Sequence, residues 1–125
     1  MGMLEGKVAI ITGSGRGIGR AAALMMAAEG AAVVVNDLDE APALGVVEEI
    51  KKAGGRAVAC PGSVTDLAVP DRLVRAAIDN FGALHILVNN AGYTWDGMLH
   101  KMTDEQWQAM LDVHVTAAFR LIRAA

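Results

Sequence analysis

A cluster of glycines near the N-terminus has the composition of a phosphate-binding loop. It follows a short apolar segment and comes directly before a stretch of helix-forming residues. Glycines at such a place let the backbone approach a diphosphate closely, and the start of a helix presents free N–H groups and a positive dipole end. The strict G-x-G-x-x-G spacing is absent, so the glycines alone indicate a phosphate site of moderate specificity. The candidate ligand-binding residues of this cluster are Gly13, Ser14, Arg16, Gly17, Ile18 and Gly19.

An acidic residue, Asp37, follows 20 residues after Gly17, at the end of a second apolar run. A carboxylate at that place can accept hydrogen bonds from both ribose hydroxyls of an adenosine, and its charge repels a 2′-phosphate. The sequence therefore favours NAD as the cofactor. NADP stays an alternative, because the Arg16 guanidinium can pair with a phosphate. A simpler interpretation, in which the glycines and Asp37 only build turns, explains less of the combined pattern.

The segments around these residues alternate between strand-like and helix-like patterns. Strands are predicted at residues 7–12, 32–37, 56–60 and 84–88. Helices are predicted at residues 18–29, from a cap at Asp39 to residue 52, over a segment ending at residue 81, and from a capping box at Thr103 to the C-terminus. Such alternation predicts an α/β fold with a parallel sheet between helices. Ligands bind such folds at the carboxyl ends of the strands, which here are residues 12–19, 36–37, 62–64 and 89 onward.

Composition and charge narrow the class of protein. The 125 residues are 54% hydrophobic and 20% charged, which predicts one folded domain over residues 1–125. A net charge of −3 with scattered Lys and Arg residues argues against a nucleic-acid partner. No apolar stretch approaches the roughly 20 residues that cross a bilayer, so no membrane partner is expected. The single cysteine, Cys60, is expected in a buried strand, which favours a cytoplasmic protein without disulfides. No metal site is predicted.

Two motifs in register with the predicted strands carry a family resemblance. Thr12-Gly13-x-x-x-Gly17-x-Gly19 and Asn89-Asn90-Ala91-Gly92 resemble the two N-terminal signatures of the short-chain dehydrogenase/reductase family. The resemblance covers essentially the whole chain. It implies a Rossmann-type, doubly wound parallel sheet with the strand order 3-2-1-4 in this portion.

The resemblance also implies roles for single residues. Residues Gly13, Arg16 and Ile18 would line the pyrophosphate, and Asp37 would hold the adenosine ribose. Asn89 would mainly brace neighbouring strands. The positions expected beside the ribose on the nicotinamide side are Asn90, Ala91 and Gly92.

The chain departs from the family pattern at two places. Ser63-Val64 stands where the family usually has Asp-Val, and the Ser63 hydroxyl accepts a hydrogen bond from adenine more weakly than a carboxylate. His114 follows Val113 where the family usually has Asn, which makes it a candidate catalytic residue. Hydroxyacyl-CoA dehydrogenase units look similar in having His there, which hints at 3-hydroxyacyl or 3-oxoacyl thioesters. A structural histidine facing the sheet explains His114 equally well.

The family's proton-transfer residues are absent from this sequence. Family members use a serine, a tyrosine and a lysine four residues after the tyrosine, whereas the only tyrosine here, Tyr93, has Gly97 at that spacing. We therefore expect an incomplete domain, truncated at its C-terminus, that is inactive alone. The complete protein is expected to be an oxidoreductase that interconverts a small-molecule secondary alcohol and ketone. The alternative is a non-catalytic dinucleotide-binding or regulatory module, which needs no such residues.

The last predicted helix carries apolar side chains that the fragment is expected to leave uncovered. These residues are Met110, Val113, Phe119 and Ile122. In the family the same helix commonly packs against another subunit, so a homo-oligomer is expected. The loop of residues 93–102 is expected near the substrate, with Trp95 and Met98 offering apolar contact.

Overall fold

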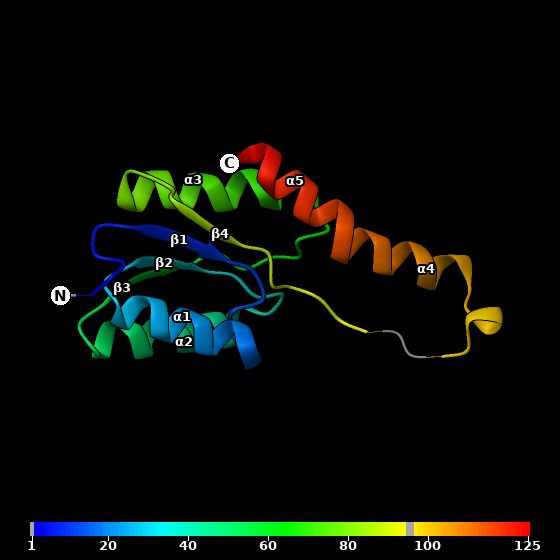
Figure 1. Cartoon of the computed structure of the whole chain (residues 1–125), viewed down its shortest axis with the longest axis horizontal. Coiled ribbons are helices and arrows are strands. Elements are labelled where there is room, and N and C mark those ends of the chain that lie inside the picture. Colours follow the sequence, from blue (N-terminus) through cyan, green and yellow to red (C-terminus); the bar gives the residue numbers. More distant parts are fainter. Residues whose placement is uncertain (1, 95–96) are drawn as a thin grey trace.

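A computed structural model, which describes residues 2–94 and 97–125, contains a four-stranded parallel sheet between helices (Figure 1). The strands are β1 (Val8–Ile11), β2 (Ala32–Val35), β3 (Arg56–Ala59) and β4 (Ile86–Val88). They pair in the order β3-β2-β1-β4. On one side of the sheet lie α1 (Gly17–Ala28) and α2 (Glu40–Lys52), and on the other α3 (Val69–Phe81) and α5 (Ala117–Ala124) (Figure 1). The predicted Rossmann-type α/β fold and its strand order are confirmed.

The two central strands, β1 and β2, are completely buried, because their side chains pack into two hydrophobic cores, one on each face of the sheet. Successive side chains of a strand point to opposite faces. Val33 and Val35 therefore pack with Ile50 beneath α1 and α2, and Val34 packs with Leu73 on the α3 side. This double burial explains why the sequence shows continuous apolar runs rather than alternation.

The first three strands end earlier than predicted, and the polar residues beyond them belong to loops, whereas β4 ends at Val88 as predicted. The second strand stops at Val35, so Asn36 and Asp37 follow it, and Cys60 lies one residue past β3. The Cys60 N–H still donates to the Val35 carbonyl at 2.8 Å. Burial raises the pKa of the Cys60 thiol, and the nearby Arg72 guanidinium partly offsets that rise.

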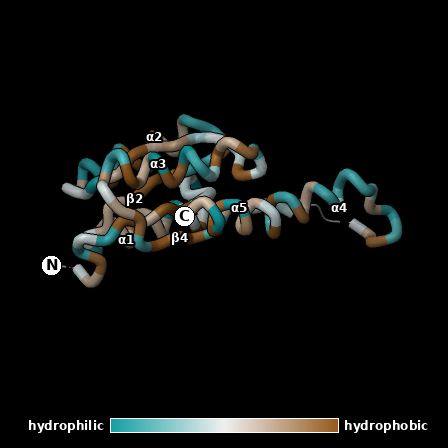
Figure 2. The backbone as a smooth tube through the Cα atoms, turned by 90° about the horizontal axis from the view of Figure 1, so that it is seen from above, coloured by the Kyte–Doolittle hydropathy of each residue, from teal (hydrophilic) through white to brown (hydrophobic). Residues whose placement is uncertain are grey.

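The helix predicted from Thr103 to the C-terminus is one rod with a π-helical turn inside it. Its parts are α4 (Asp104–Leu111), the π turn η2 (Asp112–Thr116) and α5, and a 3₁₀ turn, η1 (Leu99–Lys101), precedes it. The predicted capping box at Thr103 is present. Figures 1 and 2 show α4 extending away from the sheet, beyond the carboxyl ends of the strands.

Two sequence expectations for the helices need correction. Val113, a residue of the π turn, was expected to be uncovered but is buried, and Met110 is half-buried, whereas Phe119 and Ile122 are exposed as expected. Asp39 stands at the N-cap of α2, but its carboxylate makes no capping hydrogen bond.

In the part of the chain that the structure describes, no helix is both long and apolar enough to cross a membrane.

Two helical glycines differ in what surrounds them, which gives a test of the packing. An added Cβ at Gly19 would collide with the Gly13 carbonyl oxygen and lie 2.5 Å from the Asn90 side-chain nitrogen, whereas at Gly45 it would meet open space. We expect Gly19→Ala to lower the free energy of unfolding by about 1–3 kcal/mol. Gly45→Ala should raise it by about 0.5–1 kcal/mol, because alanine favours the helix. Urea unfolding followed by circular dichroism measures both, and equal effects would contradict this packing.

Candidate functional site

A cleft of about 700 Å³ lies at the carboxyl ends of the strands. All four strand ends contribute to its wall. The predicted site residues that line it are Gly13, Arg16, Ile18, Asp37, Ser63, Val64, Asn90, Ala91 and Gly92. The lining also includes residues that the sequence did not single out as ligand-binding, namely Asn36, Leu38, Asp39, Gly62, Thr65, Tyr93 and Val113. The predicted residues Ser14, in the glycine loop, and Gly17 and Gly19, in the first turn of α1, lie outside this lining.

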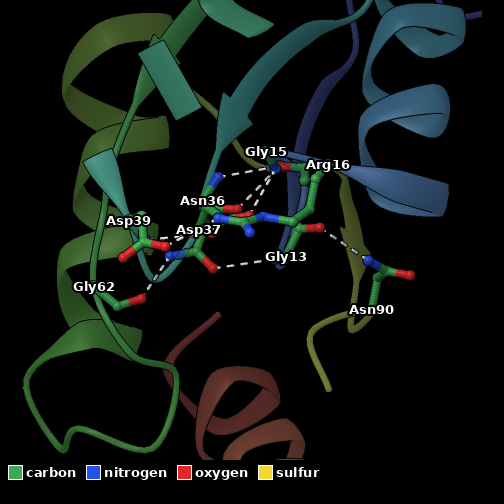
Figure 3. A network of polar contacts seen from close by, with 9 residues as sticks. Gly13, Gly15, Arg16, Asn36, Asp37, Asp39, Gly62 and Asn90 are labelled. Atoms are coloured by element: carbon green, nitrogen blue, oxygen red, sulfur yellow. Dashed lines mark hydrogen bonds and ion pairs between the residues drawn. The ribbon is translucent and has the colours of Figure 1, made fainter. Parts of the chain in front are cut away.

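The buried amide of Asn36 ties three strand ends together (Figure 3). Its Oδ1 accepts from the Gly13 N–H at 3.2 Å, in the loop after β1. Its Nδ2 donates to the carbonyls of Cys60 at 3.0 Å and Gly62 at 3.1 Å, in the loop after β3. Buried amide groups are stable only when they are hydrogen-bonded, so Asn36 fixes the positions of both loops around the cleft.

A second set of hydrogen bonds joins the ends of β1 and β4. The Thr12 hydroxyl accepts from the backbone N–H groups of Asn90 at 3.0 Å and Ala91 at 2.9 Å. The Asn90 Nδ2 donates to the carbonyls of Thr12 and Gly13 at 3.1 and 3.2 Å. Asn90 therefore braces the ends of β1 and β4, and Asn89, to which the resemblance assigns a bracing role, is exposed.

The glycine loop is built from positions with different requirements. Gly13 has a φ of +63°, and a Cβ there would lie 2.8 Å from the Ala91 Cα, so only glycine lets the β1 and β4 loops meet. Gly17 also has a positive φ, +60°, but faces open space. Ser14 is fully buried, and its hydroxyl donates to the Ile11 carbonyl at 2.7 Å. The Ser14 side chain thus supports the loop from beneath.

The start of α1 presents unpaired backbone donors next to the cleft. The first intrahelical hydrogen bond runs from the Arg20 N–H to the Arg16 carbonyl at 3.2 Å. The N–H groups of residues 17–19 therefore have no partner inside the helix. Together with the helix dipole, they favour a negatively charged group at this place.

Asp37 has the most enclosed carboxylate of the cleft, with 8% of its side chain exposed. Its Oδ2 accepts from the Gly15 N–H at 3.1 Å, and its Oδ1 accepts from the Asp39 N–H at 3.3 Å. The Arg16 guanidinium lies 3.5 Å from Oδ1 (Figure 3). A carboxylate has about four lone-pair sites, so Asp37 keeps acceptor capacity toward the cleft.

The wall formed by the β3 loop carries hydroxyl groups. The Ser63 and Thr65 hydroxyls share a hydrogen bond of 2.7 Å, and the Ser63 oxygen also accepts from the Thr65 N–H at 3.3 Å. Ser63 therefore lies on the cleft wall with a defined orientation, and Val64 beside it supplies an apolar surface.

His114 connects the π turn to the loop after β4. Its Nε2 lies 2.7 Å from the Tyr93 carbonyl oxygen, and a Cβ on Gly92 would lie 2.7 Å from its Cε1. The imidazole packs directly against the backbone of the strand-end loop and borders a small hollow beside the cleft. Met98 is exposed, and Trp95 lies outside the described residues.

Four residues that build this site were given no role in it from the sequence, although Thr12 and Asn36 lie in the strand-end segments where the ligand is expected. Asn36 and Thr12 act through backbone partners that are distant in the chain, and no local pattern announces such contacts. Leu38 and Asp39 follow Asp37 directly, so their place in the same strand-end loop was an available signal. His85, which had no assigned role, accepts from the Val8 N–H at 3.0 Å and braces β1 against β4.

Comparisons with known proteins agree with this architecture. A family model described as short chain dehydrogenase matches residues 7–125. A hydroxyacyl-CoA dehydrogenase of Mycobacterium tuberculosis is 47% identical over 98% of this chain and 40% of its own length. A 3-oxoacyl-(acyl-carrier-protein) reductase of Synechocystis is 42% identical, over 99% of this chain and 51% of its own length. A crystal structure of a short chain dehydrogenase from Mycobacterium avium matches with a TM-score of 0.96 at 42% identity.

Each of these relatives is about twice as long as the region that matches this chain. The Mycobacterium avium structure covers 99% of this chain, but only 46% of that chain is matched. The chain therefore spans about half the length of the relatives it matches.

The Asn36 network predicts a large loss of stability when its amide is removed. Asn36→Ala leaves the Gly13 N–H and two carbonyls of the β3 loop without their buried partner. We expect the free energy of unfolding to fall by about 2–4 kcal/mol. Asn80→Ala is the matched control, because the exposed Asn80 donates only to a carbonyl one turn earlier in α3, and it should cost less than about 0.5 kcal/mol. Similar losses in urea unfolding for both variants would contradict the network's role.

Proposed function

The chain belongs to the short-chain dehydrogenase family, and we propose that it is the NAD-binding part of an oxidoreductase acting on a secondary alcohol or ketone. The observation that carries this proposal is the juxtaposition of the Asp37 carboxylate with the unpaired start of α1 on one cleft wall. A carboxylate that accepts from ribose hydroxyls and a helix start that binds phosphate are the two features by which such sheets hold dinucleotides.

The residues of the cleft fit a dinucleotide from end to end. Asp37 and Leu38 lie at the β2 end of the lining, where we place the adenosine. The helix start at Gly17 is suited to the pyrophosphate, because no Cβ intrudes there and a positive dipole end faces it. The β4 end, Asn90 to Gly92, is then left for the nicotinamide side.

A nicotinamide dinucleotide, when bound, supplies or removes a hydride, and the chain's own residues hold it in place. Ser63 offers a hydroxyl and Val64 an apolar surface to the adenine side of the cleft. We propose that His114 positions the β4 loop beside the reacting end, through its contact with the Tyr93 carbonyl. A histidine in that contact does not need to touch substrate to affect the reaction.

The substrate class is inferred from relatives. The Mycobacterium tuberculosis relative is named a hydroxyacyl-CoA dehydrogenase, and the Synechocystis relative is named a 3-oxoacyl-(acyl-carrier-protein) reductase. Both names describe a thioester with oxygen at the third carbon. We propose that the complete protein acts on a 3-hydroxyacyl or 3-oxoacyl thioester in the cytoplasm. The chain alone is proposed to bind cofactor without turnover, because Tyr93 has no lysine four residues on.

Cofactor titration tests the proposal. We expect NADH to bind more tightly than NADPH, because the Asp37 charge accepts from ribose hydroxyls and repels a 2′-phosphate. Asp37→Asn should weaken NADH binding about tenfold or more, because hydrogen bonds to charged groups contribute about 1.5–3 kcal/mol. Asp79→Asn removes the same charge from the exposed side of α3 and serves as the control. Isothermal titration calorimetry measures the Kd of NADH and of NADPH for the unchanged chain, and the Kd of NADH for each of the two variants. Binding of NADPH as tight as NADH would overturn the preference, and binding of neither would overturn the proposed function.

A homo-oligomer is proposed from the exposed apolar side chains of the last helical rod. Trp107, Phe119 and Ile122 are each more than half exposed. We expect the chain to sediment as a species larger than its 13.0 kDa monomer. Phe119→Asp should shift it toward the monomer, whereas Met25→Asp, at an exposed apolar position on α1, should not. A monomer at all concentrations in analytical ultracentrifugation would contradict the proposal.

A further inference from the structure

We propose that Asp39 is a specificity-determining residue of the cofactor site, because its carboxylate engages the Arg16 guanidinium and withholds it from a 2′-phosphate. This inference rests on the proposed NAD-binding function. Arg16 is the one positively charged residue in the lining of the cleft among the described residues. A side chain that competes for Arg16 therefore affects how well the cleft accepts the 2′-phosphate of NADP.

The contacts favour Asp39 as the main partner of Arg16. The Arg16 Nη2 lies 3.0 Å from the Asp39 Oδ2 and 3.5 Å from the Asp37 Oδ1. The same nitrogen therefore contacts both carboxylates, with the shorter distance to Asp39. Figure 3 shows the guanidinium extended from the glycine loop toward the two aspartates.

Asp39 lies where its carboxylate could bond either to a backbone N–H at the start of α2 or to the Arg16 guanidinium. Asp39 is the N-cap residue of α2 and has the extended backbone that capping requires, with φ −102° and ψ 138°. A capping aspartate typically contributes about 1 kcal/mol to a helix. The Asp39 carboxylate nevertheless makes no capping bond and turns to Arg16 instead. The Asp39 carboxylate therefore makes an ion pair in place of the capping bond that local sequence favours.

The charges around the ribose end determine the direction of the effect. Asp37, Asp39 and Arg16 carry formal charges of −1, −1 and +1, which sum to −1. NAD adds no charge at the ribose 2′ position, whereas the 2′-phosphate of NADP carries about −1.5 to −2. Removing the Asp39 charge leaves Arg16 with only Asp37 as a competitor and brings the local sum to zero. NADP should then gain more than NAD.

The size of the effect is limited by solvent. The side chains of Arg16 and Asp39 are 62% and 65% exposed, so water and salt screen their attraction. Asp39 therefore acts by competition for Arg16 rather than by locking it in place. Asp37, which is buried and accepts two backbone N–H groups, remains the larger barrier to NADP.

A double-mutant cycle tests the inference by calorimetric titration of the chain with NADH and NADPH. The measured quantity is the ratio of the NADPH Kd to the NADH Kd. Asp39→Asn should lower this ratio about threefold to tenfold at low salt. Asparagine is also a good N-cap residue, so α2 should keep its start. In the Arg16→Gln background, the same change should lower the ratio by no more than about half of that factor, because no guanidinium remains to be released.

Glu40→Gln is the matched control, because it removes the same charge one residue further on, at an exposed side chain outside the cleft lining. An equal change for Glu40→Gln would overturn the inference in favour of general charge. Equal changes with and without Arg16 would also overturn it, in favour of direct repulsion by Asp39. If the unmodified chain binds NADH and Asp39→Asn leaves the ratio unchanged, only this inference fails. If the chain binds neither cofactor, the proposed function fails and the inference with it.

Discussion

The carboxyl ends of parallel strands leave backbone groups that the sheet itself cannot pair, and the cleft depends on how this chain satisfies them. Asn36 bonds to Gly13 on one side and to Cys60 and Gly62 on the other. Thr12 and Asn90 do the same between β1 and β4. Because buried polar groups without partners are costly, these side chains hold the loops in one arrangement. Asp37 and the start of α1 are positioned by this frame.

The absence of side chains at glycines also shapes this frame. A Cβ on Gly13 would strike Ala91, and one on Gly19 would strike the Gly13 carbonyl, so both glycines allow loops to approach that otherwise would be held apart. Gly92 has the same effect toward His114. The glycines therefore bring β1, β4 and the π turn close enough together for the cleft to have a continuous wall. Gly17, which faces open space, is explained by its positive φ alone, Gly19 and Gly92 by close approach alone, and Gly13 by both.

The sequence predicted the parts of this structure that follow from local pattern. Apolar runs such as 32–35 predicted the buried strands, and the order of strands and helices predicted the sheet. Asp37 was given a ligand-binding role from its spacing, whereas Asn36 was expected at the same strand end but was given no role there. The difference is physical, because Asp37 presents a charge at a strand end, while Asn36 bonds to backbone groups 23 to 26 residues away. Contacts with distant backbone leave no signature in the side chains of their partners.

Asp39 and His114 show how a distant contact changes the outcome of a local rule. Asp39 lies where local preference predicts a helix cap, yet Arg16, 23 residues earlier, takes its carboxylate. His114 lies in a helix that local pattern predicts to be regular, yet the helix widens to a π turn where His114 meets the Tyr93 carbonyl. π turns are uncommon and often occur at functional sites. Asp39 lines the cleft beside the proposed adenosine end, and His114 lines the small hollow next to the proposed nicotinamide end. A local preference given up at both ends of one cleft is what selection for ligand geometry, rather than for helix stability alone, would produce.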